Sequence, residues 1–177
     1  MTTPRPGVHL EPLDESHVPM IESFLDDEDV LRFTLIPVPV PDGFAESWIR
    51  RYQEGRDEGT REAFAIIDSA GEPGGVVMAV SIDRAAREVE LGYVVAPAAR
   101  GRGLAQAAVL QMTDRAFSEY GALRVELIIS ASNTASRRVA ERCGYVREGV
   151  MRSHHVKGDV RDDTEIWARL PTDPLPG

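Results

Sequence analysis

The sequence predicts an α+β fold with a single mixed, mainly antiparallel sheet flanked by helices. The chain has 177 residues, which is about one domain at ~150 residues per domain. Hydrophobic residues make up 42% of it, enough for a core at this length. Strand-like segments follow one another as hairpins in the first half and alternate with helical segments in the second.

The first half is expected to hold two helices and four strands. Asp14 or Ser16 caps a helix in which apolar side chains recur at helical spacing. Alternating prolines within residues 31–43 forbid a helix and favour an extended apolar loop, which packs on the core or on a substrate. The turn residues 69–74 separate two strands. The remaining expected elements are a helix over Phe44–Glu58 and strands over residues 8–13, 61–68, 76–83 and Glu88–Val95.

The second half is expected to alternate helices and strands. A long helix over residues 104–120 ends at Gly121. Its expected buried face consists of Ala105, Ala108, Val109, Met112, Ala116 and Tyr120. Asn133 and Gly144 are good caps for a helix over residues 133–143. The expected strands are Arg124–Ser130, 145–152 and 164–170.

The ends of the chain are rich in proline. The expected domain covers residues 8–170, with tails at residues 1–7 and 171–177. No apolar run reaches the ~18 residues of a membrane span, and the first seven residues lack the apolar segment of a signal peptide. Cys143 is the only cysteine, so an intramolecular disulfide is excluded and a cytoplasmic location is expected.

The net charge of −9 argues against a nucleic-acid partner, because the phosphate backbone of a nucleic acid is bound by a basic surface. This charge suits a cationic substrate such as an amine, although acidic residues also simply keep a protein soluble. A metal site is not expected, since one cysteine and four histidines lack the usual ligand spacing.

A glycine-rich turn between a strand and a long helix is the most informative feature of residues 93–106. The first N–H groups of a helix are free and carry partial positive charge. Gly101 and Gly103 would let a diphosphate reach these groups, and Arg100 and Arg102 would add positive charge.

Three phosphate-binding patterns share this logic. The dinucleotide fingerprint G-x-G-x-x-G fails because Gln106 stands at its last position, and the P-loop tripeptide G-K-[ST] does not occur. The pattern that fits is [RQ]-x-x-G-x-[GA], filled by Arg100, Gly103 and Ala105. The alternative is a glycine-rich turn without a ligand.

A second motif follows after one more strand. Asn133 and Ser136 form N-x-x-S at a helix start, and Gly144-Tyr145 stands at that helix's end. With the segment E-L-G-Y at residues 90–93, these motifs resemble the GNAT superfamily of acyl-CoA-dependent N-acyltransferases. The resemblance is closest to the branch of ribosomal-protein N-terminal acetyltransferases, the RimJ/RimL type. It covers nearly the whole element order and is most specific over residues 88–149.

The resemblance implies the GNAT fold and transfer of an acetyl group from acetyl-CoA to a primary amine in a ternary complex. The acceptor would be a protein N-terminus or a small-molecule amine, and a homodimer is expected for such a family. The CoA pyrophosphate would be held by N–H groups of Gly101, Arg102, Gly103, Leu104, Ala105 and Gln106. The preceding strand would splay from its neighbour and pair with the pantetheine arm through Tyr93, Val94 and Val95. Asn133 would contact that arm, with Ser136 near the thioester sulfur.

Amine attack on a thioester needs a proton acceptor. Glu90 is the favoured base, directly or through a water, because it lies in the strand expected to carry the acyl group. By alternation it faces away from Val89, Leu91 and Tyr93. Glu126 on the next strand is the second candidate, and bulk water is the third.

The reaction also needs a donor for the oxyanion and one for the leaving thiolate. The backbone N–H of Val95 is expected to serve the oxyanion. The family often has a tyrosine seven positions after the asparagine, where this chain has Ala140, so Ser136 is the expected donor to the thiolate. Cys143 is interpreted as a core residue, since the dipole at the C-terminal end of its helix disfavours a thiolate.

Two other functions remain open. The acyl group could be another one, such as succinyl, because the phosphate motif does not contact the acyl end. The chain could also be a catalytically silent CoA-binding or interaction module on the same fold. His154 or His155 is expected to touch substrate in a loop before residue 164, whereas Trp48 and Trp167 are expected in the core.

Overall fold

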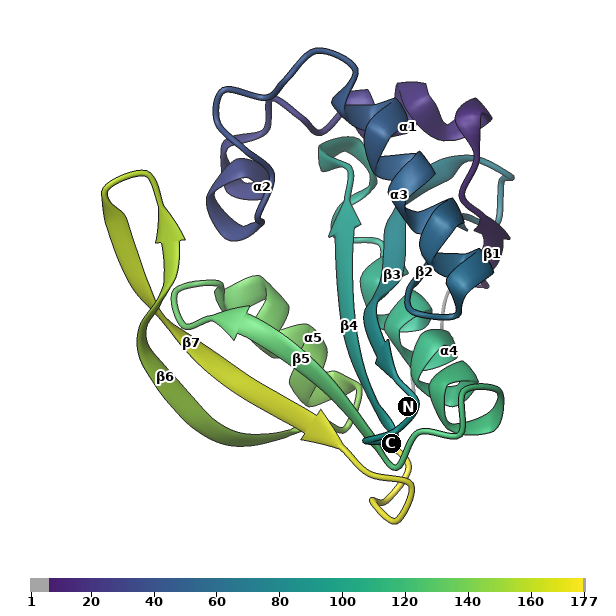
Figure 1. The fold of residues 1–177 in the computed structure, drawn as a ribbon, viewed down its shortest axis with the longest axis vertical. Coiled ribbons are helices and arrows are strands. Elements are labelled where there is room, and N and C mark those ends of the chain that lie inside the picture. Colours follow the sequence, from purple (N-terminus) through teal and green to yellow (C-terminus); the bar gives the residue numbers. More distant parts are fainter. Residues whose placement is uncertain (1–6, 177) are drawn as a thin grey trace.

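The computed structural model describes residues 7–176, which form one seven-stranded sheet in the order β1-β2-β3-β4-β5-β7-β6 (Figure 1). The strands are β1 (His9–Pro12), β2 (Glu62–Ile67), β3 (Pro73–Asp83), β4 (Glu88–Val95), β5 (Arg124–Ser130), β6 (Val146–Lys157) and β7 (Val160–Arg169). Strands β4 and β5 run parallel, and the other neighbouring pairs are antiparallel. The predicted mixed, mainly antiparallel sheet is confirmed.

Helices cover both faces of the sheet (Figure 1). They are α1 (Val18–Glu22), α2 (Glu28–Phe33), α3 (Phe44–Glu58), α4 (Leu104–Ser118) and α5 (Thr134–Arg142). Because strand side chains alternate, β2 supplies both layers: Phe64 and Ile66 join the cluster under α4, and Ala63 and Ala65 join the cluster under α1 and α3.

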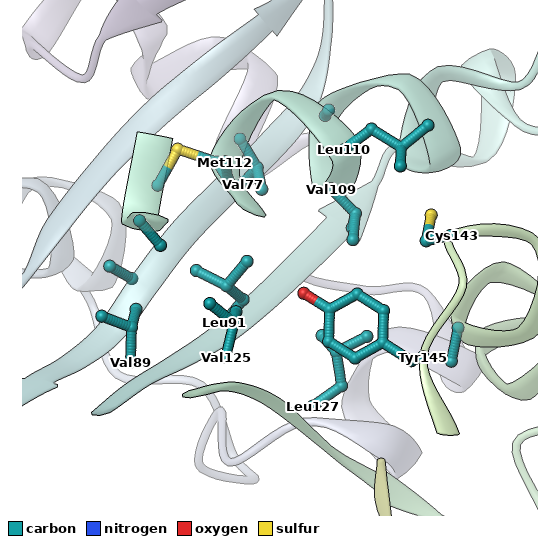
Figure 2. Close-up of a cluster of buried hydrophobic side chains, with 14 of the residues drawn as sticks. Val77, Val89, Leu91, Val109, Leu110, Met112, Val125, Leu127, Cys143 and Tyr145 are labelled. Carbon is teal, nitrogen blue, oxygen red and sulfur yellow. The ribbon is translucent and has the colours of Figure 1, made fainter. Parts of the chain in front are cut away.

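The cluster under α4 joins the two halves of the sheet. Figure 2 shows Val89 and Leu91 of β4 facing Val109 and Met112 of α4. Burying a side chain of this size contributes ~1.5–3 kcal/mol. Cys143 lies in the same cluster and is fully buried, which confirms its interpretation as a core residue.

Helix α2 was not predicted and occupies the start of the segment expected to be irregular. Asp27 caps it, because the side chain accepts a hydrogen bond from the N–H of Val30 (2.9 Å). The irregular loop therefore begins at Thr34, just before the prolines. Earlier in the chain, Asp14 rather than Ser16 is the cap, and it caps a 3-10 turn that precedes α1.

The end of α4 also differs from the expectation. The helix ends at Ser118, so Tyr120 lies beyond it, half-buried, with its hydroxyl bonded to the Glu62 carboxylate. Ala105 is only half-buried. The other four predicted residues, Ala108, Val109, Met112 and Ala116, are buried as expected. The buried face also includes Leu104, Ala107, Leu110 and Thr113.

The last hairpin is longer than expected. β6 continues to Lys157, so His154 and His155 lie in a strand, and their placement in a loop was wrong. A register shift between Met151 and His155 breaks the side-chain alternation that would have extended the prediction. Trp167 is buried, as predicted, whereas Trp48 is only half-buried.

Most of the tail expected at residues 1–7 falls outside the described residues. From residue 7 to residue 176, no helix is long and apolar enough to cross a membrane.

Candidate active site

Strands β4 and β5 separate in the middle of the sheet. Their parallel pairing runs from Glu88 and Arg124 to Leu91 and Leu127 and then ends. Beyond this point the two strands diverge in a V (Figure 1). The last residues of β4, 92–95, pair with β3 on one side and face the opening on the other. Tyr93, Val94 and Val95 therefore line an edge at which an extended ligand could add.

The glycine-rich turn lies at the end of β4 that borders this opening. Gly101 and Gly103 have φ angles of +75° and +77°, a region in which side chains are strained. Gly103 is the N-cap of α4, and no side chain caps its N–H groups. The first turn of α4 contains no acidic residue, so its free N–H groups and dipole favour an anion.

The two arginines of the turn are both bound to carboxylates. Arg100 forms a bidentate pair with Asp27, with Nη2–Oδ1 at 2.6 Å and Nη1–Oδ2 at 3.2 Å. The hydrogen bond from Arg100 lowers the pKa of Asp27. Arg102 pairs with the buried Asp68 of the β2–β3 turn. Backbone N–H groups of that turn, followed by the Arg102 side chain, lower the pKa of Asp68. The arginines thus tie the glycine turn to its neighbours.

On the other side of the opening, Asn133 and Ser136 lie at the start of α5. Asn133 caps the helix, its Oδ1 accepting from the Ser136 N–H (3.0 Å). Ser136 Oγ lies 2.8 Å from Tyr93 Oη, so a hydrogen bond links α5 to β4. Burial raises the pKa of Tyr93, which keeps the phenol protonated. Ala140 is fully buried in the core.

Glu90 lies on the opposite face of the sheet from this pair. Its neighbours Val89 and Leu91 belong to the cluster under α4, so Glu90 points toward the α3 side. Burial, followed by the charges of Glu126 and Glu88, raises the pKa of Glu90. A ligand in the opening would therefore meet a carboxylate on one face and a hydroxyl pair on the other.

Glu126 lies beside Glu90 in the parallel register but has a basic partner. Arg124 contacts Glu126 (Nη2–Oε2 3.1 Å) and also reaches Glu148 (2.8 Å). Within residues 7–176, Glu90 has no such partner. The two carboxylates that the sequence left as candidate bases therefore lie in different electrostatic surroundings.

Helix α2 and the β6–β7 hairpin contact each other beside the opening. Lys157 Nζ donates to the carbonyls of Thr34 (3.1 Å) and Ile36, and His155 Nε2 lies 2.9 Å from the Arg32 carbonyl. Sequence reasoning missed these contacts. A cap at Asp27 followed by two acidic residues is the signal that could have revealed α2.

His154 lies 3.3 Å from the Thr164 hydroxyl, so both histidines contact the protein itself. Across the described residues, no group of three His, Cys, Asp or Glu side chains could hold a metal ion.

Comparison with known proteins adds independent findings. Residues 8–146 match a family model described as an acetyltransferase (GNAT) domain. A relative from Bacillus subtilis (strain 168), named "Putative ribosomal N-acetyltransferase YdaF", is 32% identical over 142 residues, covering 80% of this chain and 70% of that protein.

Solved structures share the architecture. RimL, a ribosomal L7/L12 alpha-N-protein acetyltransferase solved with coenzyme A, superposes with a TM-score of 0.83 at 21% identity, covering 92% of this chain and 93% of that one. A spermidine N-acetyltransferase from Vibrio cholerae, solved with CoA and spermine, gives a TM-score of 0.82 at 17% identity, covering 94% and 96%. At these identities the likeness establishes the fold.

Proposed function

The chain belongs to the GNAT acetyltransferase family and is an acyl-CoA N-acyltransferase, and we propose that its reaction takes place at the opening between β4 and β5. One observation carries this proposal. The β4–β5 pairing ends at Leu91 and Leu127, and the part of β4 beyond it leads through a 3-10 turn (Pro97–Ala99) to the glycine turn at the N-terminus of α4. An edge for an extended arm and a site for a diphosphate therefore lie end to end, as an acyl-CoA requires.

Acetyl-CoA would bind along this path. The N–H groups of residues 101–106 would hold the pyrophosphate, supported by the positive φ of Gly101 and Gly103. The edge of β4 would pair with the pantetheine arm through Tyr93, Val94 and Val95. Asn133 uses its Oδ1 to cap α5, which leaves its amide N–H groups for a carbonyl oxygen of the arm.

Transfer would use both faces of the sheet. The neutral amine attacks the thioester carbonyl from the side of Glu90, which takes the proton directly or through a water. The Val95 N–H stabilises the oxyanion. When the carbon–sulfur bond breaks, the electron pair goes to sulfur, and Ser136 donates a hydrogen bond to the thiolate.

Glu90 is preferred over Glu126 as the base for a physical reason. Arg124 forms an ion pair with Glu126, whereas burial and neighbouring carboxylates raise the pKa of Glu90. A raised pKa makes a carboxylate a better proton acceptor at neutral pH. Glu126 and bulk water remain the alternatives that mutation distinguishes.

The acceptor is an amine, and the names of two relatives support a proposal for its class. One relative is named for ribosomal N-acetylation and another, from Escherichia coli K12, is a spermidine N(1)-acetyltransferase. We propose a protein N-terminus or a small-molecule amine. We also propose a cytoplasmic location, which rests on the single, buried Cys143. The homodimer expected from the family stays a prediction.

The experiment is a mass-shift screen of acyl-CoAs against amine and peptide libraries. We expect the mass of one acetyl group on a primary amine, with acetyl-CoA as the preferred donor. Transfer from succinyl-CoA alone would reassign the acyl group. Tight CoA binding by calorimetry without transfer to any acceptor would make the chain a silent CoA-binding module.

A further inference from the structure

We propose that Tyr93 is a positioning residue that orients the Ser136 hydroxyl toward the leaving thiolate. The inference rests on the proposed function, because it takes Ser136 as the donor to sulfur. The observation behind it is the 2.8 Å contact between Tyr93 Oη and Ser136 Oγ, which joins β4 to α5.

Chemistry decides the direction of this hydrogen bond. We assign Tyr93 as the donor and Ser136 as the acceptor, because a phenol is a stronger acid than an aliphatic alcohol and therefore a better donor. Burial keeps the Tyr93 proton in place by raising its pKa. With its oxygen accepting from Tyr93, Ser136 has its own O–H free for another acceptor.

The usual alternative for a serine in a helix is a bond back to the carbonyl of the preceding turn. Within the described residues, the Ser136 hydroxyl makes no such bond, and its hydrogen-bond partner is the Tyr93 hydroxyl. The backbone N–H of Ser136 is already taken by the Asn133 side chain. The Ser136 oxygen is thus positioned by its hydrogen bond to Tyr93, and the Ser136 O–H remains available to a ligand atom.

Tyr93 is itself firmly held. Its ring packs against the cluster under α4, and its backbone belongs to the β3–β4 ladder, opposite Val77. The same strand carries Val95, the proposed oxyanion donor, two residues away. One rigid strand would therefore position the donors for the two atoms that gain negative charge, the carbonyl oxygen and the sulfur.

Departure of the thiolate does not require either hydroxyl to lose its proton. When the carbon–sulfur bond breaks, sulfur holds the electron pair, and the Ser136 O–H stabilises it by a hydrogen bond. The hydrogen bond that Tyr93 donates polarises the Ser136 O–H and so strengthens the hydrogen bond from Ser136 to sulfur. The proton that finally resides on sulfur comes from solvent, so neither Tyr93 nor Ser136 ends as an anion.

The test is a double-mutant cycle on kcat with Tyr93→Phe, Ser136→Ala and the pair. Phe keeps the ring in the cluster and removes only the hydroxyl. We expect Tyr93→Phe to lower kcat about three- to tenfold while the acetyl-CoA KM and the CoA Kd stay within about twofold. In the Ser136→Ala background, Tyr93→Phe should change kcat by less than about twofold.

The matched control is Tyr145→Phe, which also removes a buried hydroxyl, but one bonded to Thr113 in the core (2.7 Å). Its kcat should equal that of the wild type. If Ser136→Ala keeps a normal kcat, the donor role in the proposed function fails. If Ser136→Ala is slow but Tyr93→Phe is normal, or the two losses multiply, the positioning role of Tyr93 is overturned. A weaker CoA Kd in Tyr93→Phe would likewise overturn it and assign the hydroxyl to CoA binding.

Discussion

Leu91 of β4 and Leu127 of β5 are the last residues paired between the two parallel strands, and both side chains are 2% exposed. The opening begins directly after these two residues, where the strands separate. On the α4 face of the sheet, both side chains belong to one buried cluster (Figure 2). The opening is therefore created by the divergence of the two strands, and the last paired residues beside it are buried in an apolar cluster.

Truncating one of these buried leucines should destabilise the protein. Leu127→Ala is expected to reduce the free energy of unfolding by about 2–5 kcal/mol, because it leaves a cavity where the strands last pair. Urea denaturation measures the loss. Leu123→Ala, at a side chain 51% exposed, is the control and should change stability by less than ~0.5 kcal/mol. Equal effects would show that the cluster does not support the opening.

The glycine turn should be intolerant of a side chain. Gly103→Asp would strain a backbone with φ of +77° and bring a negative charge to the proposed pyrophosphate site. We expect CoA affinity to fall at least tenfold, or ~1.4 kcal/mol, by calorimetry. Gly158→Asp is a matched control, since Gly158 also has a positive φ (+57°) but lies in the β6–β7 turn. Unchanged CoA binding in a folded Gly103→Asp protein would contradict the assignment of the turn.

The role of Glu90 as the proton acceptor is tested by a substitution that removes its charge and keeps its shape. Glu90→Gln should lower kcat/KM by roughly 10²-fold or more, with CoA binding retained because the turn is untouched. Glu126→Gln should stay near the wild-type rate at the optimal pH. The reverse result would make Glu126 the base, and normal rates in both variants would mean that water takes the proton.

The pH dependence follows from the raised pKa of Glu90. A base works in its ionised form, so kcat/KM falls as the pH drops through its pKa. Since burial and the charges of Glu126 and Glu88 raise this pKa above the ordinary 4.5, the acidic limb should lie above pH 4.5. Glu126→Gln removes one of the negative charges and should move the limb to lower pH. A limb unmoved by Glu126→Gln would contradict the coupling.

The buried hydroxyl pair of Tyr145 and Thr113 should respond asymmetrically. Thr113 donates to the Val109 carbonyl (2.7 Å), so Tyr145 donates to Thr113. Tyr145→Phe leaves every remaining group satisfied and should cost about 0.5–1.5 kcal/mol, whereas Thr113→Val strands a buried phenol and should cost about 1–3 kcal/mol. Urea denaturation of both variants checks the order.

Local signals explain which elements the sequence could predict. The bounds of β4, β5 and α3 agree with the structure, because alternation, a helical repeat and glycine at both ends of α3 mark them directly. Helix α2 has six residues, too few to be stable without tertiary contacts, and its neighbours are far away in the chain. The β6–β7 hairpin was underestimated because a register shift interrupts its alternation.

The candidate site shows the same division. The turn and the two caps of α5 are contiguous motifs, so their residues could be found without coordinates. The contact of Tyr93 with Ser136 spans 43 residues, and that of Arg100 with Asp27 spans 73. No local pattern encodes such pairs. Sequence alternation placed Glu90 on the face of the sheet opposite Val89 and Leu91. Only the structure shows that Arg124 pairs with Glu126 and not with Glu90.

The contacts between α2 and the last hairpin have a consequence for the order of folding. Arg32 and Thr34 find His155 and Lys157 123 residues later in the chain. Contacts at such separation carry a high loop-closure entropy and form slowly. During synthesis, α2 leaves the ribosome long before β6, so its contacts with His155 and Lys157 cannot form until that strand has emerged. The wall beside the opening therefore depends on contacts that cannot form before β6 and β7 have been synthesised.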